Sequence, residues 1–461
     1  MARFWRSISG VAAAALIGAA TPALADDPPV LLPLTPSTAS PAVAPAPAAP
    51  IPALVAPAKA KAKIFHPPPL ETALSNDPTP TLTPATAAAT ATAAQRYAAI
   101  AAAGGWPTDI PPLATGAKGP MVAQLRRRLA IEGDLERDAA DGPDAEVWDA
   151  RLIAALKRFQ GRVGLRETGV VSAATAKALD VPAATRVEEL SASATRLADY
   201  SGFAFGERYV VVNLPATAVE AVENGQVVRR YAAIVGDVDH PSPQIAAHVA
   251  AIDLNPTWTV PVSIIKKEII PRMQRDPGYL AREKIRILDG TGAEVDPRSI
   301  NWTTERAANF TLRQDSGAGN SLGAIRIDMP NKLAVYMHDT PSKRLFGADY
   351  RFLSHGCVRV QGVYDLAAWL LAGTGGAPAS EWDSAELQTE IKTGASEAIR
   401  LTRSTPVIWV YLTGWANADG PANFRDDVYG LDAAGEPGAS AVDPLTSLIQ
   451  APLPADATAA Q

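Results

Sequence analysis

Apolar side chains between residues 112 and 182 recur three and four positions apart, the spacing that lines one face of an α-helix. Three such runs follow one another: Met121, Val122, Leu125 and Leu129; Leu152, Leu156 and Phe159; Ala176 and Leu179. Gly133 can end the first helix, and the Ser172 hydroxyl can accept from free amides at the start of the third. The pattern predicts a small three-helix domain over 112–182, near the lower size limit for a self-supporting core.

Two further helices are expected on either side of this domain. The alanine-rich stretch within 88–111 favours a scaffold helix that stops at Gly104-Gly105. A polar run within 184–205 predicts a linking helix.

From residue 206 to residue 431 the pattern changes to short apolar runs rich in β-branched residues. Tyr209–Leu214 is ended by Pro215, and Val227–Val235 is ended by Gly236. Three similar runs are Ile325–Asp328, Ala334–Met337 and Val407–Leu412. Such runs predict a mainly β domain, so the fold class is α+β. The charged stretch 262–311 reads as an insertion, partly helical, that covers one face of the sheet.

The N-terminus has the pattern of a cleavable secretory signal peptide over residues 1–25. Arg3 and Arg6 give a positive start, Val11–Ala20 is apolar, and Ala23-Leu24-Ala25 is a small-x-small cleavage site. The apolar run is too short to span a bilayer, and no other stretch approaches about 20 apolar residues. We therefore expect a periplasmic protein without stable membrane insertion after cleavage.

Composition separates the chain ends from the domains. About half of the 40 prolines fall in the N-terminal quarter, and residues 26–87 consist mainly of Pro, Ala and Thr. Such a segment buries too little apolar surface to offset its ordering entropy, which predicts a disordered tether. Residues 432–461 return to Ala, Pro and Ser and are predicted to be a disordered tail. The net charge of −6 gives no support for binding nucleic acid or anionic membranes.

The chain has one cysteine, Cys357, within Ser354-His355-Gly356-Cys357. A free thiol is mostly protonated at neutral pH, and an imidazole can take its proton or stabilise the thiolate. His338 ends a predicted strand and can approach from the neighbouring strand, while His355 is the second candidate. Amides near Gly356 could hold an oxyanion. The combination predicts a nucleophile, although each residue taken singly is more often structural.

The remaining histidines, His66, His240 and His248, have no such neighbours and are interpreted as non-catalytic. One Cys and two His are too few for a zinc site, so no metal is expected. The chain also lacks a Gly-x-Gly-x-x-Gly or Walker loop, and no cofactor is expected.

The cysteine segment resembles a hallmark of the L,D-transpeptidases of the bacterial cell wall, specifically their long periplasmic form. That hallmark is a histidine, here His338, followed after a spacer by Ser/Thr-His-Gly-Cys-x-Arg, here 354–359. Further matching segments are 211–215, 255–261, 276–280, 312–314, 320–323 and 424–430. The resemblance runs from about Ala93 to Asp432.

The helical domain resembles the family's peptidoglycan-binding module. The matching positions are Leu125, Leu129, Gly133, Phe159-Gln160, Gly164-Leu165 and Gly169-Val170-Val171. A helical scaffold without affinity for glycan is an equally open interpretation, because a fold does not fix a function.

The resemblance implies a role for each site residue. Cys357 would attack the diaminopimelate carbonyl of a tetrapeptide stem, and His338 would accept and return the proton. Amides around Gly356 and Cys357 would hold the oxyanion, D-alanine would leave, and an amine of a second stem would resolve the thioester into a cross-link. Supporting positions are His355 and Ser354. Substrate contacts would come from Tyr336, Arg359 and Trp258. The insertion 262–311 resembles a lid, and family members are commonly acylated by carbapenems.

Two other functions stay open from the sequence. Water could resolve the same thioester, which would make the protein an L,D-carboxypeptidase or endopeptidase. A non-catalytic protein that binds the wall through its helical domain is the alternative from another class. The acyl acceptor (a stem peptide, a lipoprotein lysine, a free D-amino acid or water) is not readable from these residues.

Overall fold

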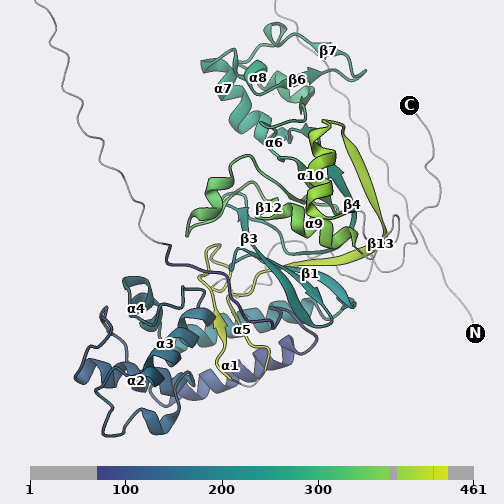
Figure 1. Ribbon diagram of the computed structural model, residues 1–461. Coiled ribbons are helices and arrows are strands. Elements are labelled where there is room, and N and C mark those ends of the chain that lie inside the picture. Colours follow the sequence, from purple (N-terminus) through teal and green to yellow (C-terminus); the bar gives the residue numbers. More distant parts are fainter. Residues whose placement is uncertain (1–69, 373–381, 419, 434–461) are drawn as a thin grey trace, which may run out of the picture. The chain divides into compact units, whose positions relative to one another are not determined.

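The computed structural model describes residues 70–372, 382–418 and 420–433 (Figure 1). The predicted signal peptide, the tether as far as residue 69 and the tail beyond residue 433 lie outside the described residues. The chain divides into two compact units, Met1–His66 and Pro67–Gln461, and all described residues belong to the second. Within the described residues, no helix has both the length and the apolar character needed to cross a membrane.

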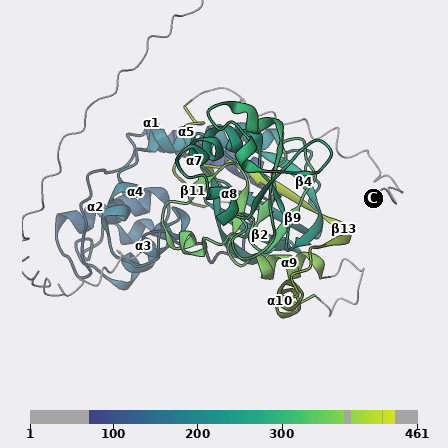
Figure 2. The same ribbon diagram turned by 90° about the horizontal axis from the view of Figure 1, so that it is seen from above.

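The N-terminal part of the described chain is helical. Its helices are α1 (Thr86–Ala102), α2 (Pro120–Glu132), α3 (Ala150–Arg162), α4 (Ala173–Leu179) and α5 (Ala183–Asp199), with a short 3₁₀ turn η1 (Arg137–Ala139). Helices α2, α3 and α4 lie together in both views (Figures 1 and 2) and share an apolar core. Gly133 ends α2 with φ +102°, and the Ser172 side chain accepts from the Thr175 amide at the start of α4. We call α2–α4 with their connections (residues 112–182) the helical domain.

The large sheet has the strand order β11-β3-β12-β10-β9-β4-β13-β1-β2, and β2 also pairs with β3. Pairing therefore runs in a closed ring through every strand of this sheet except β11. The strands are β1 (Arg208–Asn213), β2 (Ala218–Glu223), β3 (Gln226–Gly236), β4 (Ile245–Leu254), β9 (Ile325–Asp328), β10 (Met337–His338), β11 (Phe352–Ser354), β12 (Val358–Val360) and β13 (Glu397–Val410). Two helices, α9 (Val363–Leu371) and α10 (Ser384–Lys392), contribute Leu366, Leu370 and Leu387 to its core.

A second, smaller sheet, β5-β8-β6-β7, forms much of the insertion (Figure 1). Its strands are β5 (Trp258–Thr259), β6 (Ile285–Leu288), β7 (Glu294–Val295) and β8 (Thr311–Gln314). The accompanying helices are α6 (Val262–Ile264), the π-helix η2 (Ile265–Ile269), α7 (Ile270–Arg275), α8 (Tyr279–Arg282), η3 (Pro297–Ser299) and η4 (Glu305–Asn309). These elements bury an apolar cluster of their own, so the insertion is a packed subdomain.

The last described elements are η5 (Lys343–Gly347), which precedes β11, and the two-stranded sheet of β14 (Gly414–Trp415) and β15 (Asn423–Phe424). The fold class is α+β, as predicted, with a mainly β part and a helical domain.

Three predicted boundaries were wrong. The strand predicted over Ala334–Met337 begins only at Met337, because Ala334 has φ +53°, which a strand cannot accommodate. The strand predicted from Val407 begins at Glu397, because its first half is largely exposed and lacks an apolar run.

The third correction concerns the tether, which was predicted to be disordered as far as residue 87. Its last part packs on the β domain: Asp349 accepts from the amides of Glu71 and Thr72, and Glu220 accepts from the amide of Thr81. Leu82 is buried beside them. Partners far along the chain satisfy this backbone, which composition alone does not reveal.

Candidate active site

The cysteine lies in a tight loop between β11 and β12. Gly356 has φ +106°, a left-handed conformation that side chains rarely adopt, and Cys357 directly precedes Val358, the first residue of β12. The chain therefore turns sharply at Gly356 and presents the half-buried thiol at the start of a strand.

Two serine hydroxyls fix this loop. Ser354 Oγ donates to the Cys357 carbonyl and accepts from the Gly356 amide at 3.3 Å. Ser242 Oγ donates to the Gly356 carbonyl at 2.7 Å and accepts from the Gly236 amide at 2.9 Å. Within the described residues the amide of Cys357 has no partner, whereas that of Gly356 is already engaged. The free donor beside the sulfur is thus the Cys357 amide.

Strands β10 and β12 pair in parallel, with Met337 opposite Val358 and His338 opposite Arg359. Side chains alternate across a strand, so His338 and Arg359 share one face, on which Cys357 lies two residues before Arg359. Strand spacing and rise place the Cα atoms of His338 and Cys357 on a diagonal of about 8 Å. The imidazole and the thiol, from segments nineteen residues apart, are therefore neighbours on one face.

The imidazole of His338 is buried, with 5% of the residue exposed. It hydrogen-bonds to backbone groups of Asp339 and Leu322, while its Nδ1 has no hydrogen-bond partner among the described residues. The donating nitrogen is therefore Nε2, which leaves Nδ1 as a free acceptor. Burial and, to a smaller extent, the Arg359 guanidinium lower the pKa of His338 to about 3, so the imidazole is neutral at pH 7.

The thiol is also neutral at rest. Burial raises the pKa of the Cys357 thiol, and contacts with the backbone and hydroxyl of Tyr336 and the charge of Arg359 oppose this rise without cancelling it. Tyr336 is itself largely buried; burial and the neighbouring Cys357 raise the pKa of its hydroxyl, which also contacts Trp258. The rings of Tyr336 and His338 meet edge to face with centroids 5.7 Å apart.

Arg359 adds positive charge to this face. Burial lowers the pKa of its guanidinium, and its buried Nε has no hydrogen-bond partner in the part of the chain that the structure describes. A negative charge that develops on sulfur or on a bound oxyanion would be stabilised by this unpaired cation. The predicted site residues Cys357, His338, Tyr336, Arg359 and Trp258 are thus brought together.

The insertion meets the cysteine loop through charged side chains. His355 Nε2 lies 2.7 Å from Glu268 Oε1 on η2, and the His355 ring packs against His240 with centroids 4.6 Å apart. His240 in turn contacts Lys267 Nζ at 3.1 Å and Asp237 Oδ1 at 3.0 Å. Sequence reasoning set His240 aside as isolated, and only the long-range packing of η2 and β3 against the loop reveals its neighbours.

The face formed by β10 and β12 supports nucleophilic chemistry. A neutral thiol lies near an unpaired imidazole nitrogen, with a free amide and a cation beside it. Among the described residues, no three His, Cys, Asp or Glu side chains are grouped to hold a metal ion. The groups present are those of acyl transfer through a thioester.

Comparison with known proteins gives two domain matches. Residues 207–381 match the family described as "L,D-transpeptidase catalytic domain", and residues 118–179 match the one described as "Putative peptidoglycan binding domain". A curated relative, "Putative L,D-transpeptidase" of Haemophilus influenzae, is 30% identical over 246 residues, which are 53% of this chain and 48% of the relative. The chain thus spans about half the length of this relative.

Two solved structures are similar in part. An L,D-transpeptidase (Yku) from Stackebrandtia nassauensis has 14% identity and a TM-score of 0.25, with 67% of this chain and 99% of that chain covered. The L,D-transpeptidase (residues 123–326) from Xylanimonas cellulosilytica has 18% identity and a TM-score of 0.22, with 66% and 100% covered. These TM-scores are too low to support a structural argument. Residues 207–381 are thus similar to the L,D-transpeptidase catalytic domain, and residues 118–179, which precede them, are similar to a putative peptidoglycan binding domain.

Proposed function

We propose that this protein is a peptidoglycan L,D-transpeptidase that cross-links stem peptides through a thioester on Cys357, with release of D-alanine. The observation that carries the proposal is the shared face of β10 and β12, where the Cys357 thiol lies near the unpaired Nδ1 of buried His338. The catalytic-domain match over 207–381 supports the same chemistry.

In the first half-reaction, Cys357 Sγ attacks the carbonyl of the third stem residue while its proton moves to His338 Nδ1. The tetrahedral oxyanion accepts from the Cys357 amide and lies near the Arg359 guanidinium, with Gly356 and Ser354 holding the loop. The C–N bond then breaks, and His338 returns the proton to the departing amine of D-alanine. A thioester remains.

In the second half-reaction, a side-chain amine of another stem attacks the thioester carbonyl. Nδ1 of His338 takes a proton from that amine, the C–S bond breaks, and the proton returns to sulfur. An amide has been exchanged for an amide, so no nucleotide is consumed. Tyr336 contacts the Cys357 thiol and Trp258 contacts the Tyr336 hydroxyl, so both side chains would contact the bound stem.

The depressed pKa of His338 and the raised pKa of the thiol favour a neutral resting pair over a preformed ion pair. Proton transfer to His338 then accompanies nucleophilic attack by Cys357, so negative charge develops on the sulfur only when substrate is present. Such a thiol would be protected from adventitious oxidation, which requires the thiolate.

The helical domain would hold the enzyme on its polymer, which is the function suggested by the match over 118–179. Peptidoglycan lies beyond the inner membrane, so we propose periplasmic action after export through the signal peptide, 1–25. His355, which contacts Glu268 of the insertion, would orient the loop and hold the insertion as a lid beside the thiol.

The test is to incubate the full chain with purified disaccharide-tetrapeptide muropeptides and to resolve the products by mass. The expected products are dimers linked between third residues, together with free D-alanine, and Cys357→Ala should give neither. Trimmed tripeptide monomers without dimers would identify a hydrolase instead. Unchanged substrate with normal pull-down on sacculi would identify a non-catalytic wall-binding protein.

A further inference from the structure

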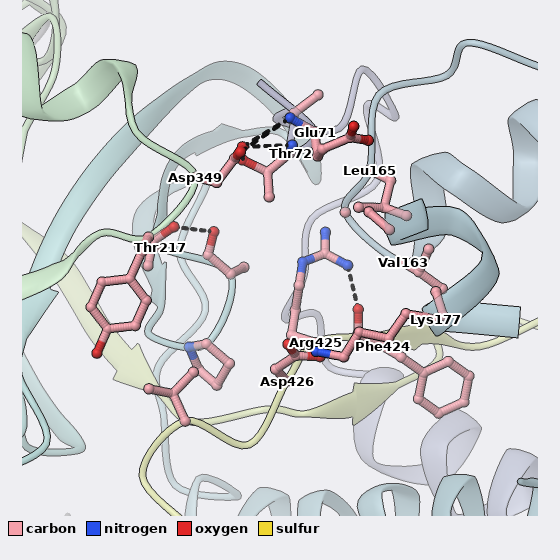
Figure 3. Close-up of a pocket in the computed structure, with 18 of the residues that line it drawn as sticks. Glu71, Thr72, Val163, Leu165, Lys177, Thr217, Asp349, Phe424, Arg425 and Asp426 are labelled. Carbon is pink, nitrogen blue, oxygen red and sulfur yellow. Dashed lines mark hydrogen bonds and ion pairs between the residues drawn. The ribbon is translucent and has the colours of Figure 1, made fainter. Parts of the chain in front are cut away.

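A cavity lined by residues of the helical domain and of the β domain contains neither Cys357 nor His338 (Figure 3). Its volume is about 330 Å³, which is within the range of small-ligand sites. The helical domain contributes Val163, Leu165 and Lys177 to its wall. The β domain contributes the loop before β2, the segment before β11 and the residues after β15. None of the residues assigned to the reaction lines it.

Arg425 extends into the middle of this cavity (Figure 3). Its Nη1 donates to the carbonyls of Arg162 (2.8 Å) and Phe424 (2.6 Å), and within the described residues no carboxylate forms an ion pair with it. Burial and, to a smaller extent, the charge of Arg230 lower the pKa of Arg425 to about 10. The carboxylates of Glu220 and Asp426 act on this charge only from a distance, and the guanidinium keeps donors that are not used by the two carbonyls.

Arg351, a second arginine of the same wall, also donates only to neutral oxygen atoms within the described residues. Arg351 donates to Thr217 Oγ1 and to the Ala348 carbonyl, its Nε is buried without a hydrogen-bond partner, and burial lowers its pKa. Arg186, the other buried cation of the wall, is paired with Glu189.

The three acidic residues of the wall are largely occupied or exposed. Asp349 accepts from the amides of Glu71 and Thr72, and Glu71 accepts from Ser172. Asp426 is exposed at 3.9 Å from Lys177. An anion that enters the cavity would therefore meet two cations without carboxylate partners.

The helical domain leaves space for the key arginine. Gly164 has φ +76°, and a Cβ at this position would lie 2.7 Å from Arg425 Nε. Any side chain there would displace the guanidinium. Apolar side chains of Val163, Leu165 and Phe424 lie nearby (Figure 3). The site therefore suits a carboxylate that carries a small apolar group, because a guanidinium binds carboxylates through two parallel hydrogen bonds.

We propose that this cavity binds the free carboxylate end of a peptidoglycan stem peptide, with Arg425 as the anchoring residue. The proposal rests on the proposed function, since it takes its ligand from the same polymer. A stem that ends in D-alanine presents a carboxylate beside a methyl group, which fits the cation and the apolar wall. The cavity and the cysteine loop share β11, whose Phe352 lines the cavity. A second stem held here would raise the local concentration of acceptor near the thioester.

Photo-crosslinking of the full chain in the Cys357→Ala background tests this proposal without turnover. The probe is a synthetic stem tetrapeptide that carries a diazirine, compared with the same peptide amidated at its C-terminus. Labelled residues are mapped by peptide mass. We expect saturable labelling within 163–177 or 424–428 by the acid, and at least tenfold weaker apparent affinity for the amide.

Three variants in this background sharpen the result. Arg425→Gln should weaken labelling of the cavity at least tenfold. Lys177→Glu, at an exposed position on the cavity wall, should weaken it about two- to fivefold. Lys157→Glu makes the same charge change on α3 away from the cavity and should have no effect. If Arg425→Gln does not fold, the proposal is tested by the effect of Lys177→Glu and by the comparison of the acid probe with the amide probe.

Labelling confined to segments around Tyr336–His338 and His355–Arg359, or equal labelling of the cavity by acid and amide, would overturn the proposal. The proposed function fails separately, through the absence of products from muropeptides. A chain that makes dimers but is not labelled in the cavity rejects only this inference.

Discussion

Two buried polar clusters in this protein are built in opposite ways. In the helical domain, Glu132 is fully enclosed by partners: Arg128 and Arg162 form ion pairs with its carboxylate, and Tyr97 donates to it at 2.9 Å. On the face of β10 and β12, His338 Nδ1 and Arg359 Nε are buried without hydrogen-bond partners. The first, closed cluster pairs its charges, although Arg128 Nη2 has no hydrogen-bond partner within the described residues, whereas the second, open cluster leaves an acceptor nitrogen and a cation without ion-pair partners there.

The pKa values of the two clusters show what this difference does. Burial alone would raise the pKa of Glu132, but Arg128 and Arg162 overcome it and hold that pKa far below its usual range. At His338 and Cys357 burial prevails, and both groups stay neutral. A closed cluster stabilises the fold, because removing one partner exposes the others to the cost of an unpaired charge. An open cluster keeps its free hydrogen-bonding groups and its charge available for a substrate.

The sharpest test of the open cluster is Cys357→Ala. Loss of the nucleophile should reduce dimer formation by at least about 10³-fold. The free energy of unfolding should change by less than about 1 kcal/mol, because the thiol is half-buried and holds no structural ion pair. Product mass analysis and urea unfolding measure the two effects.

Incubation with a carbapenem should also distinguish the unsubstituted chain from Cys357→Ala, with the shift in intact mass as the readout. One covalent adduct is expected on the unsubstituted chain and none on Cys357→Ala. An adduct on both would place the reactive group elsewhere.

The closed cluster should respond in stability. Glu132→Gln leaves Arg128 and Arg162 without their shared carboxylate and should lower the free energy of unfolding by about 3 kcal/mol. Glu136→Gln, at an exposed position nearby, is the matched control and should stay within about 0.5 kcal/mol. Equal urea midpoints for both variants would show that the ion pairs contribute little.

The open cluster should make stability depend on pH. The pKa of His338 is about 3 in the folded chain, against about 6.5 for an unfolded histidine. Between these values the unfolded state binds the proton first, so stability is lost as pH falls from about 6.5 towards about 3, by up to about 1.4 kcal/mol per unit. His338→Gln should reduce this slope, as measured by urea unfolding at pH 6 and pH 4. Identical slopes would contradict a neutral buried imidazole.

The smallest expected effect concerns the lid. Glu268→Gln removes the charge that contacts His355, and because both side chains are more than a third exposed we expect a two- to fivefold rise in KM. Glu305→Gln removes another ion pair of the insertion, with Lys266, and is the matched control. A change of equal size in both variants would indicate general loosening of the insertion.

Local patterns in the sequence determined the helices, most strands and the identity of the candidate nucleophile. Apolar spacing sets which face of α2 and α3 is buried. Gly133 marks a helix end through its backbone conformation and Ser172 marks a helix start through its side chain, and both effects act over only a few residues. The lone Cys357 and its glycine were visible for the same reason. The start of β10 was not, because Ala334 takes a left-handed conformation that its residue type does not signal.

Only the tertiary structure decided which distant groups meet. Parallel pairing of β10 with β12 brings His338 to the face of Cys357, and packing of η2 joins His240 and His355 to one charged cluster. The ordered end of the tether depends on two distant carboxylates. Asp349 lies 277 residues along the chain from Thr72, and Glu220 lies 139 residues from Thr81. The free Nδ1 of His338 is likewise a property of its surroundings, since burial of this atom without a hydrogen-bond partner among the described residues arises only when separate segments pack together.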